Sequence, residues 1–334
     1  MRVSIVIPCY RSEQTLGPLV EAIFAALAEP SAASVVSEFE VVLVVDGSPD
    51  GTADVANQLA AARPEVRAIE LRRNYGQHNA LLAGIARAKY EVIVTMDDDL
   101  QHLPDQIPAM LTPLARGEAD LVYGVPREEE HGVWRSASSR TVKRGLALAG
   151  VPKAEDVSAF RAFWTAQREG FTGIEDPYVS LDVMLSWTTT SISRVVVQMD
   201  QRLIGTSSYS LHALVRHSMN MITGYSNVPL RVVAWLGGVC ALIGAVLGAV
   251  VLWNFAAGDT TVAGFTTIAA MVAIFSGAQM LSLGIIGEYL GRLHTRSTGK
   301  PTFLVKTDSD KMIAPGQGDN KIVPGQGEAL DADR

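Results

Sequence analysis

The chain is organised around the stretch Val92–Ile–Val–Thr–Met–Asp97–Asp98–Asp99–Leu100–Gln101. Its first half is apolar and rich in β-branched residues, which is typical of a buried strand, and it ends at three consecutive acidic residues. Neighbouring carboxylates repel one another by roughly 1–4 kcal/mol at ~4 Å, and a bound cation would remove that cost. Mg²⁺ and Mn²⁺ prefer oxygen ligands and leave coordination positions for substrate phosphates. The stretch is therefore either a metal–diphosphate site at the carboxyl end of a strand or a solvated acidic turn.

The composition of the 334 residues restricts the classes of protein to consider. The net charge of −7, without a Lys/Arg-rich run interleaved with aromatic residues, argues against nucleic-acid binding. The hydrophobic content of 48% is high for a wholly soluble chain. Two cysteines, Cys9 and Cys240, are too few for a disulfide framework, and we interpret both as structural residues in a reducing compartment. The N-terminal residues 1–8 lead directly into a strand and lack the shape of a signal peptide.

Strand-like and helix-like segments alternate through the first third of the chain. Apolar, β-rich runs predict strands at residues 2–7, 39–45, 66–71, 90–96 and 120–123. Segments with helical spacing lie between these runs. This β-α-β-α order predicts an α/β fold with a doubly wound, mostly parallel, Rossmann-like sheet.

Polar residues gather where the predicted strands end. Ligands of doubly wound sheets bind beyond the carboxyl ends of the strands. Four polar clusters fall there, at residues 8–10, 46–48, 74–77 and 97–101. Because they would converge on one edge of the sheet, the interpretation of the three acids as a solvated turn loses ground.

The segment between residues 128 and 159 is polar and basic. Three of its arginines, Arg135, Arg140 and Arg144, are spaced so that they could share one helical face. Since a guanidinium binds phosphate oxygens in two-pronged fashion, this face is either a phosphate clamp or a solvated helix surface. A strand at residues 160–164, a helix at 179–190 and a strand at 192–199 are expected to follow.

Two later segments, residues 232–253 and 265–286, are apolar and almost uncharged. Each has about the ~20 residues needed to cross a ~30 Å hydrocarbon core. The loop between them contains no Lys or Arg, whereas Arg and Lys flank both outer ends. The positive-inside rule therefore predicts a multi-pass protein of the inner or plasma membrane, with two spans and with the N-terminal domain and both termini in the cytoplasm.

These features divide the chain into four parts. They are a cytosolic α/β domain at 1–210, an amphipathic interfacial helix region at 211–229, a transmembrane hairpin at 230–291 and a cytosolic tail at 292–334. The interfacial helix is expected because apolar residues alternate with Arg216 and His217 over residues 211–225. The tail is polar and acidic and is expected to be disordered after about residue 307. Glycines in the spans would permit close helix packing within one chain or between copies, so a homo-oligomer stays open.

Five motifs, in this order, resemble the family-2 inverting glycosyltransferases of GT-A fold. The motifs are Val3–Ser–Ile–Val–Ile–Pro–Cys–Tyr10, Val45–Asp–Gly–Ser–Pro–Asp–Gly–Thr52, Arg73–Asn–Tyr–Gly–Gln–His–Asn79, Met96–Asp–Asp–Asp–Leu–Gln–His102 and Gly287–Glu–Tyr–Leu–Gly–Arg292. With the two apolar segments, the chain resembles the membrane-bound polyprenyl-phosphate glycosyltransferases, a subgroup that contains bactoprenol glucosyltransferase, undecaprenyl-phosphate aminoarabinose transferase and dolichol-phosphate mannose synthase. The resemblance covers about residues 1–306.

The resemblance implies a set of site residues. The residues implied to hold Mg²⁺ or Mn²⁺ are Asp97, Asp99 and Gln101. The residues implied to line the nucleotide pocket are Pro8, Tyr10, Glu13, Asp46, Gln77 and Asp98, the last with a weaker claim to the metal. The residues implied to act near the donor and acceptor phosphates are Arg127, Arg202 and Asp156. Asp156 would orient the acceptor, act as a base or only cap a helix or turn.

The implied reaction is transfer of a sugar, a hexose or an aminosugar, from a nucleotide-diphosphate sugar to a polyprenyl (undecaprenyl or decaprenyl) phosphate. A UDP-sugar is the favoured donor, the anomeric centre would be inverted, and the product would supply cell-envelope glycan modification. A lipid phosphate with a pKa of ~6 is largely ionised in the cytosol, so the site needs positive charge more than a strong base. The candidates for that charge are Arg127, Arg135, Arg140, Arg144, Arg161 and Arg202.

Two other functions stay open. A polysaccharide synthase would carry a Gln-x-x-Arg-Trp motif, which the sequence lacks. A non-catalytic membrane scaffold that binds nucleotide sugars is supported by two departures from the family pattern, Val45 in place of an Asp and Ala159 in place of an acid.

Overall fold

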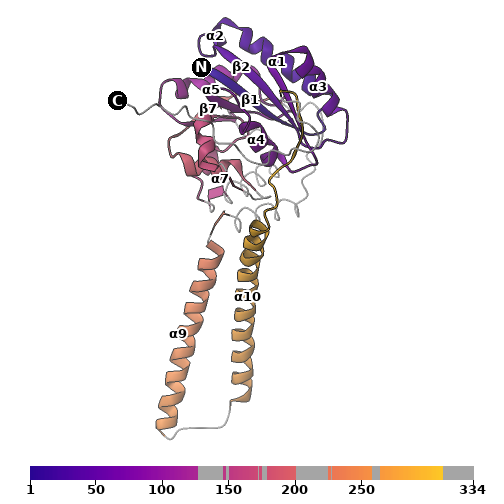
Figure 1. The fold of residues 1–334 in the computed structure, drawn as a ribbon. Helices are drawn as coiled ribbons and strands as arrows, with labels where there is room; N and C mark the ends of the chain where they lie inside the picture. Colours follow the sequence, from indigo (N-terminus) through magenta and orange to yellow (C-terminus); the bar gives the residue numbers. More distant parts are fainter. Residues whose placement is uncertain are drawn as a thin grey trace, which may run out of the picture.

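The computed structural model describes residues 1–126, 146–147, 150–171, 173–174, 179–200, 225–226, 228–257 and 264–310. An α/β domain lies at one end of two long helices, α9 (Val228–Ala256) and α10 (Phe265–Ser297) (Figure 1). Most of the predicted interfacial helix lies outside the described residues, as does the chain beyond residue 310.

An eight-stranded sheet forms the centre of the domain, in the order β7-β5-β6-β4-β1-β2-β3-β8. The strands are β1 (Arg2–Cys9), β2 (Glu38–Val45), β3 (Val66–Leu71), β4 (Val92–Thr95), β5 (Leu121–Pro126), β6 (Arg161–Trp164), β7 (Ile192–Val197) and β8 (Val305–Asp308). The pairs β1–β2, β1–β4, β2–β3 and β5–β7 are parallel. β6 and β8 run antiparallel to their neighbours. The prediction of an α/β sheet is confirmed. The sheet is mixed, because β6 between β4 and β5 and β8 at the edge run opposite to the other six strands.

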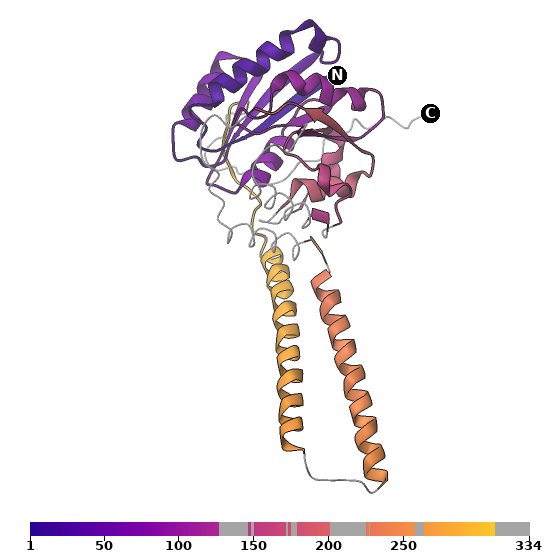
Figure 2. The same cartoon turned by 180° about the vertical axis from the view of Figure 1, so that it is seen from behind.

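Helices cover both faces of the sheet (Figure 2). Val3, Ile5 and Ile7 of β1 pack into a core with α1 (Leu16–Ala28), α3 (Thr52–Ala62) and α5 (Ile107–Ala115). The short elements α2 (Pro30–Ala33) and η1 (Pro104–Gln106) border this face.

The opposite face of the sheet packs against α4 (Gln77–Ile85) and α7 (Leu181–Thr188). Val6 of β1 belongs to this second core, as the alternation of side chains along a strand requires. The short elements η2 (Ala154–Asp156) and η3 (Thr165–Phe171) flank β6 in the chain. Figure 1 shows that the α4 and α7 side of the domain is turned toward α9 and α10.

The two long helices contact one another and carry exposed apolar side chains along their length. Among the described residues, one helical stretch, Val228–Val250, is long and apolar enough to cross a membrane. α10 is 33 residues long and exposes large apolar side chains such as Ile274 and Met280. The second predicted span does not pass the same test within the described residues, so it stays a proposal.

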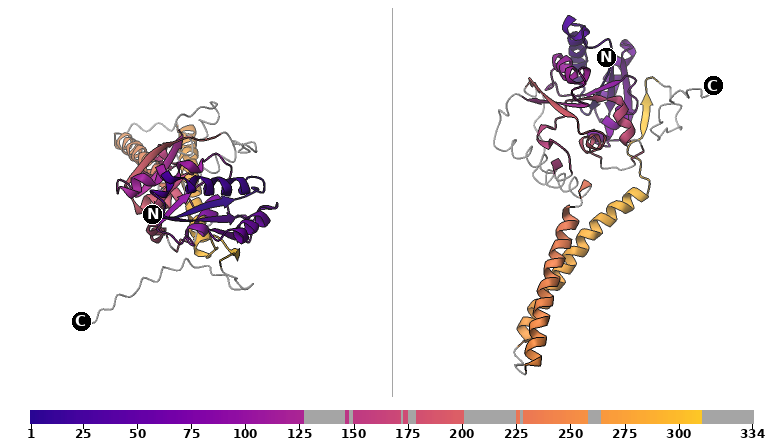
Figure 3. Two further views of the ribbon diagram at one scale, coloured as in Figure 1. Left: turned by 90° about the horizontal axis from the view of Figure 1, so that it is seen from above. Right: turned by 90° about the vertical axis from the view of Figure 1, so that its left-hand side faces the viewer.

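After α10 the chain returns to the domain and forms β8 on the outer edge of the sheet (Figure 3). β8 pairs antiparallel with β3, and Asp308 at its end is buried. No secondary structure was predicted after residue 303, because the segment is short and polar and its partner strand lies far away in the sequence.

Candidate functional site

An open cavity of about 230 Å³ lies at the carboxyl ends of β1, β2 and β4. It is lined by residues from all four polar strand ends that the sequence analysis singled out. The lining residues are Pro8, Cys9, Tyr10, Asp46, Asn74, Gly76, Gln77, Asp97, Asp98 and Asp99. Seven of the residues predicted for the metal and nucleotide sites are therefore in this set, whereas Glu13 and Gln101 are not.

Asp97 and Asp99 both contribute to the cavity wall. Oδ1 of Asp97 accepts a hydrogen bond from Nε2 of Gln77 at 2.5 Å. Oδ1 of Asp99 accepts one from the backbone N–H of Gln101 at 3.2 Å. Leu100 between them has a φ of 62°, so the chain turns sharply directly after Asp99.

The oxygen-rich wall fits a hard divalent cation. Mg²⁺ is usually held by one or two carboxylates together with substrate phosphates, and Asp97 and Asp99 supply such a pair. Among the residues that the structure describes, no group of three or more His, Cys, Asp and Glu side chains is arranged to hold a metal. The two carboxylates would therefore bind a cation jointly with the oxygens of a diphosphate.

His102 is buried and holds the backbone of Asp97 in place. Its Nδ1 accepts a hydrogen bond from the backbone N–H of Asp97 at 3.1 Å, and its ring stacks on Phe160 with 5.2 Å between centroids. Burial lowers the pKa of His102 to about 4, so the imidazole is neutral near pH 7 and Nδ1 can accept. His102 ends the motif Met96–His102, and the sequence pattern assigns it no role.

Asp46 joins the end of β2 to the loop that precedes α4. Its two carboxylate oxygens accept hydrogen bonds from the backbone N–H groups of Tyr75 and Gly76, both at 2.7 Å. Burial raises the pKa of Asp46, although these hydrogen bonds and the charge of Arg73 oppose the shift. Gly47 has a φ of 56°, and a Cβ there would lie 2.3 Å from the backbone carbon of Arg73. Asp46 therefore forms part of the cavity wall and holds the neighbouring loop in place. Its predicted contact with the nucleotide stays a prediction.

Asp98 and Glu13 hold loops in the same way. Asp98 accepts hydrogen bonds from the backbone N–H of Tyr10 at 3.1 Å and from the hydroxyl of Ser12. Burial, the largest cause, raises the pKa of Asp98 to about 6. Glu13 accepts a hydrogen bond from the backbone N–H of Gly51 at 3.1 Å. Three residues predicted to contact the nucleotide thus use their carboxylates to hold the loops around the cavity.

Of the three residues predicted for catalysis, the structure describes Asp156, which does not line the cavity. Asp156 is buried in η2 and accepts a hydrogen bond from Nη1 of Arg194 at 2.9 Å. Arg127 and Arg202 lie outside the described residues, as do Arg135, Arg140 and Arg144 of the basic segment at 128–159. Arg161 was one of six candidates for the positive charge near the phosphates, but its guanidinium is buried in an ion pair with Asp182, which removes it from that set.

Comparison with known proteins decides the family. The chain matches the family model of glycosyl transferase family 2 over residues 4–168 and that of the GtrB C-terminal hairpin over residues 228–293. A relative from Pectobacterium carotovorum is 30% identical over 309 residues, which cover 91% of this chain and 92% of the relative. The chain belongs to glycosyl transferase family 2.

Further relatives of this family-2 glycosyltransferase align over nearly its whole length. One from Pseudomonas aeruginosa is 32% identical, covering 91% of this chain and 89% of the relative. One from Yersinia enterocolitica is 30% identical, covering 96% of each. All three relatives are named undecaprenyl-phosphate 4-deoxy-4-formamido-L-arabinose transferase.

Solved structures align with this family-2 glycosyltransferase only loosely. Glucosyl-3-phosphoglycerate synthase from Mycobacterium tuberculosis has a TM-score of 0.48 and 18% identity, covering 66% of this chain and 77% of that one. Staphylococcus aureus TarS 1–349 has a TM-score of 0.47 and 18% identity, covering 67% and 66%. Scores of this size carry no information on the ligands of this chain.

Proposed function

We propose that this glycosyltransferase moves a sugar from a nucleotide-diphosphate sugar, with a UDP-sugar favoured, to a polyprenyl phosphate at the cytosolic face of the membrane. Mg²⁺ or Mn²⁺ is required, and the anomeric centre is inverted. The observation that carries the proposal is the alignment, over more than nine-tenths of the chain, with relatives named as undecaprenyl-phosphate sugar transferases. The acidic cavity at the strand ends supports the donor half of the reaction.

The residues of the cavity have separate tasks in the donor half. Asp97 and Asp99 would hold the cation, with Gln101 as a further oxygen donor, and the cation would neutralise the diphosphate leaving group. Gln77 orients Asp97 through its hydrogen bond. Tyr10 is 43% exposed at the cavity wall, beside Pro8, and its ring would offer a flat apolar face to the base.

The acceptor half needs positive charge rather than a strong base. A lipid phosphate with a pKa of ~6 is already a nucleophile in the cytosol. Arg127 and Arg202 would draw it toward the donor diphosphate, because a guanidinium pairs with phosphate in two-pronged fashion. Asp156 is already hydrogen-bonded to Arg194, so an orienting role suits it better than that of a base.

The long helices would keep the enzyme where its acceptor is. A polyprenyl chain stays in the bilayer, because exposing it to water would cost ~0.8 kcal/mol for each CH₂ group. α9 and α10 would cross the membrane as two spans, with the domain and both termini on the cytosolic side and residues 211–225 in the interface. The exposed apolar side chains of both helices support this arrangement.

The proposal is tested by incubating membranes that contain the protein with polyprenyl phosphate and a panel of nucleotide sugars, with and without Mn²⁺ or Mg²⁺. We expect a metal-dependent lipid-linked sugar, identified by its mass. Asp99→Ala should abolish its formation without loss of folding or membrane attachment. Asp105→Ala is the matched control, since Asp105 is an exposed acid in η1 that does not line the cavity. Nucleotide binding without transfer from any donor would instead support a non-catalytic scaffold.

A further inference from the structure

A buried ion pair lies on the α7 side of the sheet. Arg161 of β6 and Asp182 of α7 are each 4% exposed. Nε of Arg161 lies 2.7 Å from Oδ1 of Asp182, and Nη2 lies 2.9 Å from Oδ2, so the guanidinium and the carboxylate meet in two-pronged fashion. The hydroxyl of Tyr123 also donates to Oδ1 of Asp182, at 3.1 Å.

The pair is tied to the end of β4. Thr95 of β4 and Tyr123 of β5 are the direct partners of Arg161 across β6. Nη1 of Arg161 donates to Oγ1 of Thr95 at 3.3 Å and to the backbone oxygen of Ala159 at 3.0 Å. The hydroxyl of Thr95 donates to the same oxygen of Ala159 at 2.9 Å.

Thr95 is the last residue of β4, and Asp97 follows two positions later at the cavity wall. Nη1 of Arg161 therefore connects Ala159, which lies before β6, to the end of β4, which leads into the acidic cluster. The electrostatic field of Asp97 also reaches Arg161. Burial lowers the pKa of Arg161, but the charge and hydrogen bonds of Asp182, followed by smaller contributions from Tyr123 and Asp97, raise it overall.

A contribution to stability does not by itself explain why a buried ion pair is present at this place. Removing two opposite charges from water is costly, and replacement of a buried pair by apolar residues of similar volume is often neutral or stabilising. What a two-pronged pair supplies is a fixed geometry, because its hydrogen bonds hold the planar groups in one orientation.

We propose that Arg161 and Asp182 form a positioning pair that fixes the end of β4 through Thr95, and thereby sets the Asp97 carboxylate for the cation and the diphosphate of the donor. This inference rests on the proposed function. Neither residue lines the cavity, so both act through Thr95 and Asp97 rather than on the substrate.

The test measures the binding of Mn²⁺ with UDP to the purified full-length protein, by calorimetry or by the paramagnetic resonance of the ion. The double variant Arg161→Met/Asp182→Leu removes both charges together and leaves neither buried alone. We expect its affinity for Mn²⁺ with UDP to fall by about 10–100-fold, the loss found when residues behind a metal ligand are changed. Arg161→Lys keeps the charge without the two-pronged geometry and should recover only part of this affinity.

The chain offers a matched control in a second buried pair. Arg67 and Asp308 also meet in two-pronged fashion, at 2.8 and 2.6 Å, on the edge of the sheet formed by β3 and β8. The variant Arg67→Met/Asp308→Leu should keep the wild-type affinity. An equal loss in both double variants would overturn the inference, because any buried pair would then matter equally. Unchanged affinity in a folded Arg161→Met/Asp182→Leu protein would overturn it as well.

Thr95 provides a second pair of variants in case the double variant does not fold. Thr95→Val removes the hydroxyl that Arg161 meets and leaves the ion pair intact, and we expect weaker binding of Mn²⁺ with UDP. Thr95→Ser keeps the hydroxyl and should bind as the wild type does. Equal affinities for the two variants would contradict the inference. Because binding is measured without any lipid, a failure of transfer to polyprenyl phosphate would refute the proposed function and leave this test unaffected.

Discussion

Two buried Arg–Asp pairs of nearly identical geometry lie at different places in the sheet. Arg161 and Asp182 are 21 residues apart in the sequence and lie beside the acidic end of β4. Arg67 and Asp308 are 241 residues apart and join β3 to the strand that follows α10. The same interaction therefore joins residues that are near in the sequence in one place, and residues from distant parts of the chain in the other.

The surroundings of the two carboxylates differ. Asp182 is paired with the guanidinium of Arg161 and accepts from the hydroxyl of Tyr123, and the charge of His78 acts on it more weakly. Asp308 lies between two arginines, since Nη2 of Arg67 is 2.6 Å and Nε of Arg87 is 3.5 Å from its Oδ2. Asp308 thus has a second cation if one is removed, and this difference decides how each pair should respond to substitution.

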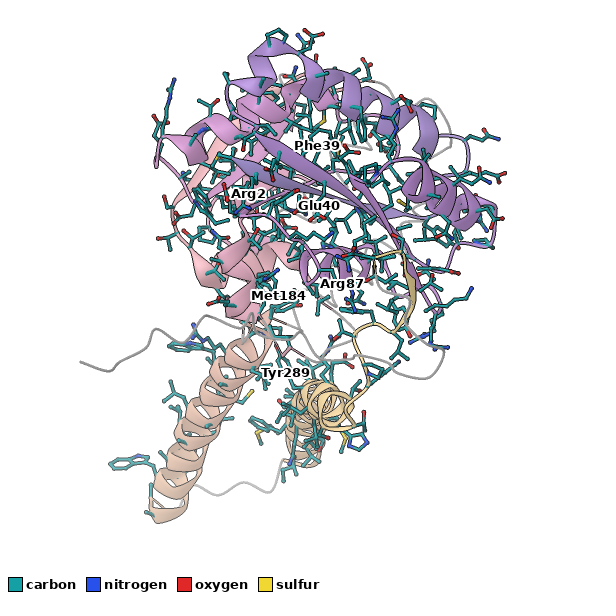
Figure 4. The ribbon with its side chains drawn as sticks, turned by 45° about the horizontal axis from the view of Figure 1, so that its top comes forward. Arg2, Phe39, Glu40, Arg87, Met184 and Tyr289 are labelled. Carbon is teal, nitrogen blue, oxygen red and sulfur yellow. The ribbon has the colours of Figure 1, made fainter. Side chains whose placement is uncertain are left out.

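The pair at Asp308 is also part of a wider attachment of α10 to the domain. Lys89 meets Asp310 at 3.1 Å, and Lys306 meets Glu70 at 2.6 Å. At the other end of this connection, Tyr289 near the domain end of α10 donates to the backbone oxygen of Ser226, which precedes α9 (Figure 4). The long helices are therefore held by hydrogen bonds and ion pairs as well as by the chain itself.

The largest effect should follow from breaking the pair near the site on one side only. Arg161→Met leaves the Asp182 carboxylate buried without its opposite charge, and we expect a loss of about 3–5 kcal/mol in the free energy of unfolding. Denaturant unfolding of the detergent-solubilised protein measures this loss. Arg161→Met/Asp182→Leu should be much closer to the wild type, and a double variant as unstable as the single one would contradict this account.

A smaller effect is expected at the edge of the sheet. Arg67→Met removes a two-pronged partner from Asp308 but leaves Arg87 beside it. We therefore expect a loss of about 1.5–3 kcal/mol, the range for hydrogen bonds to charged groups. The same unfolding experiment compares the two single variants directly. A loss larger than that of Arg161→Met would show that the second arginine does not compensate.

A still smaller loss of stability should follow from removing the partly exposed ion pair between Lys306 of β8 and Glu70 of β3. Lys306 is 53% exposed in its pair with Glu70, so solvent screens the interaction. Lys306→Ala should cost about 0.5–1 kcal/mol, seen as faster amide exchange along β3 and β8. Exchange at residues 97–101 serves as the internal control and should not change. Faster exchange at both places would mean that the edge and the site open as one unit.

The smallest effect is expected for an exposed pair. Arg2 and Glu91 meet at 3.2 Å with side chains 52% and 42% exposed, so Glu91→Gln should change stability by at most about 0.5 kcal/mol. The backbone N–H of Arg2, and then its side chain, hold the pKa of Glu91 below its usual value. A lowered folded pKa contributes stability above the unfolded pKa that is lost as the pH falls through the folded value. The difference between the variant and the wild type should therefore vanish below about pH 4, as urea unfolding at several pH values would show.

Much of the domain could be predicted because its signals are local. The run at residues 66–71 coincides with β3, and the predicted strand at 39–45 differs from β2 by one residue. The directions of β6 and β8 could not be predicted, because each is chosen by a neighbour far away in the sequence. Arg161 was counted among the candidates for binding phosphate for the same reason, since its partner Asp182 stands within an apolar helix pattern and was not singled out.

The sequence by itself determined the alternation of strands and helices, the acidic end of β4 and the apolar character of α9. These features depend on the spacing of apolar residues and on local charge, which are properties of neighbouring residues in the chain. Only the tertiary structure decided which carboxylates of the cavity wall also hold loops, and which carboxylates elsewhere pair with arginines. Asp46, Asp97 and Asp98 look alike in the sequence, yet Asp46 and Asp98 accept backbone N–H groups from other loops. The partner of a charged or polar group is set by distance in the folded chain, and that distance is fixed only when the sheet has formed.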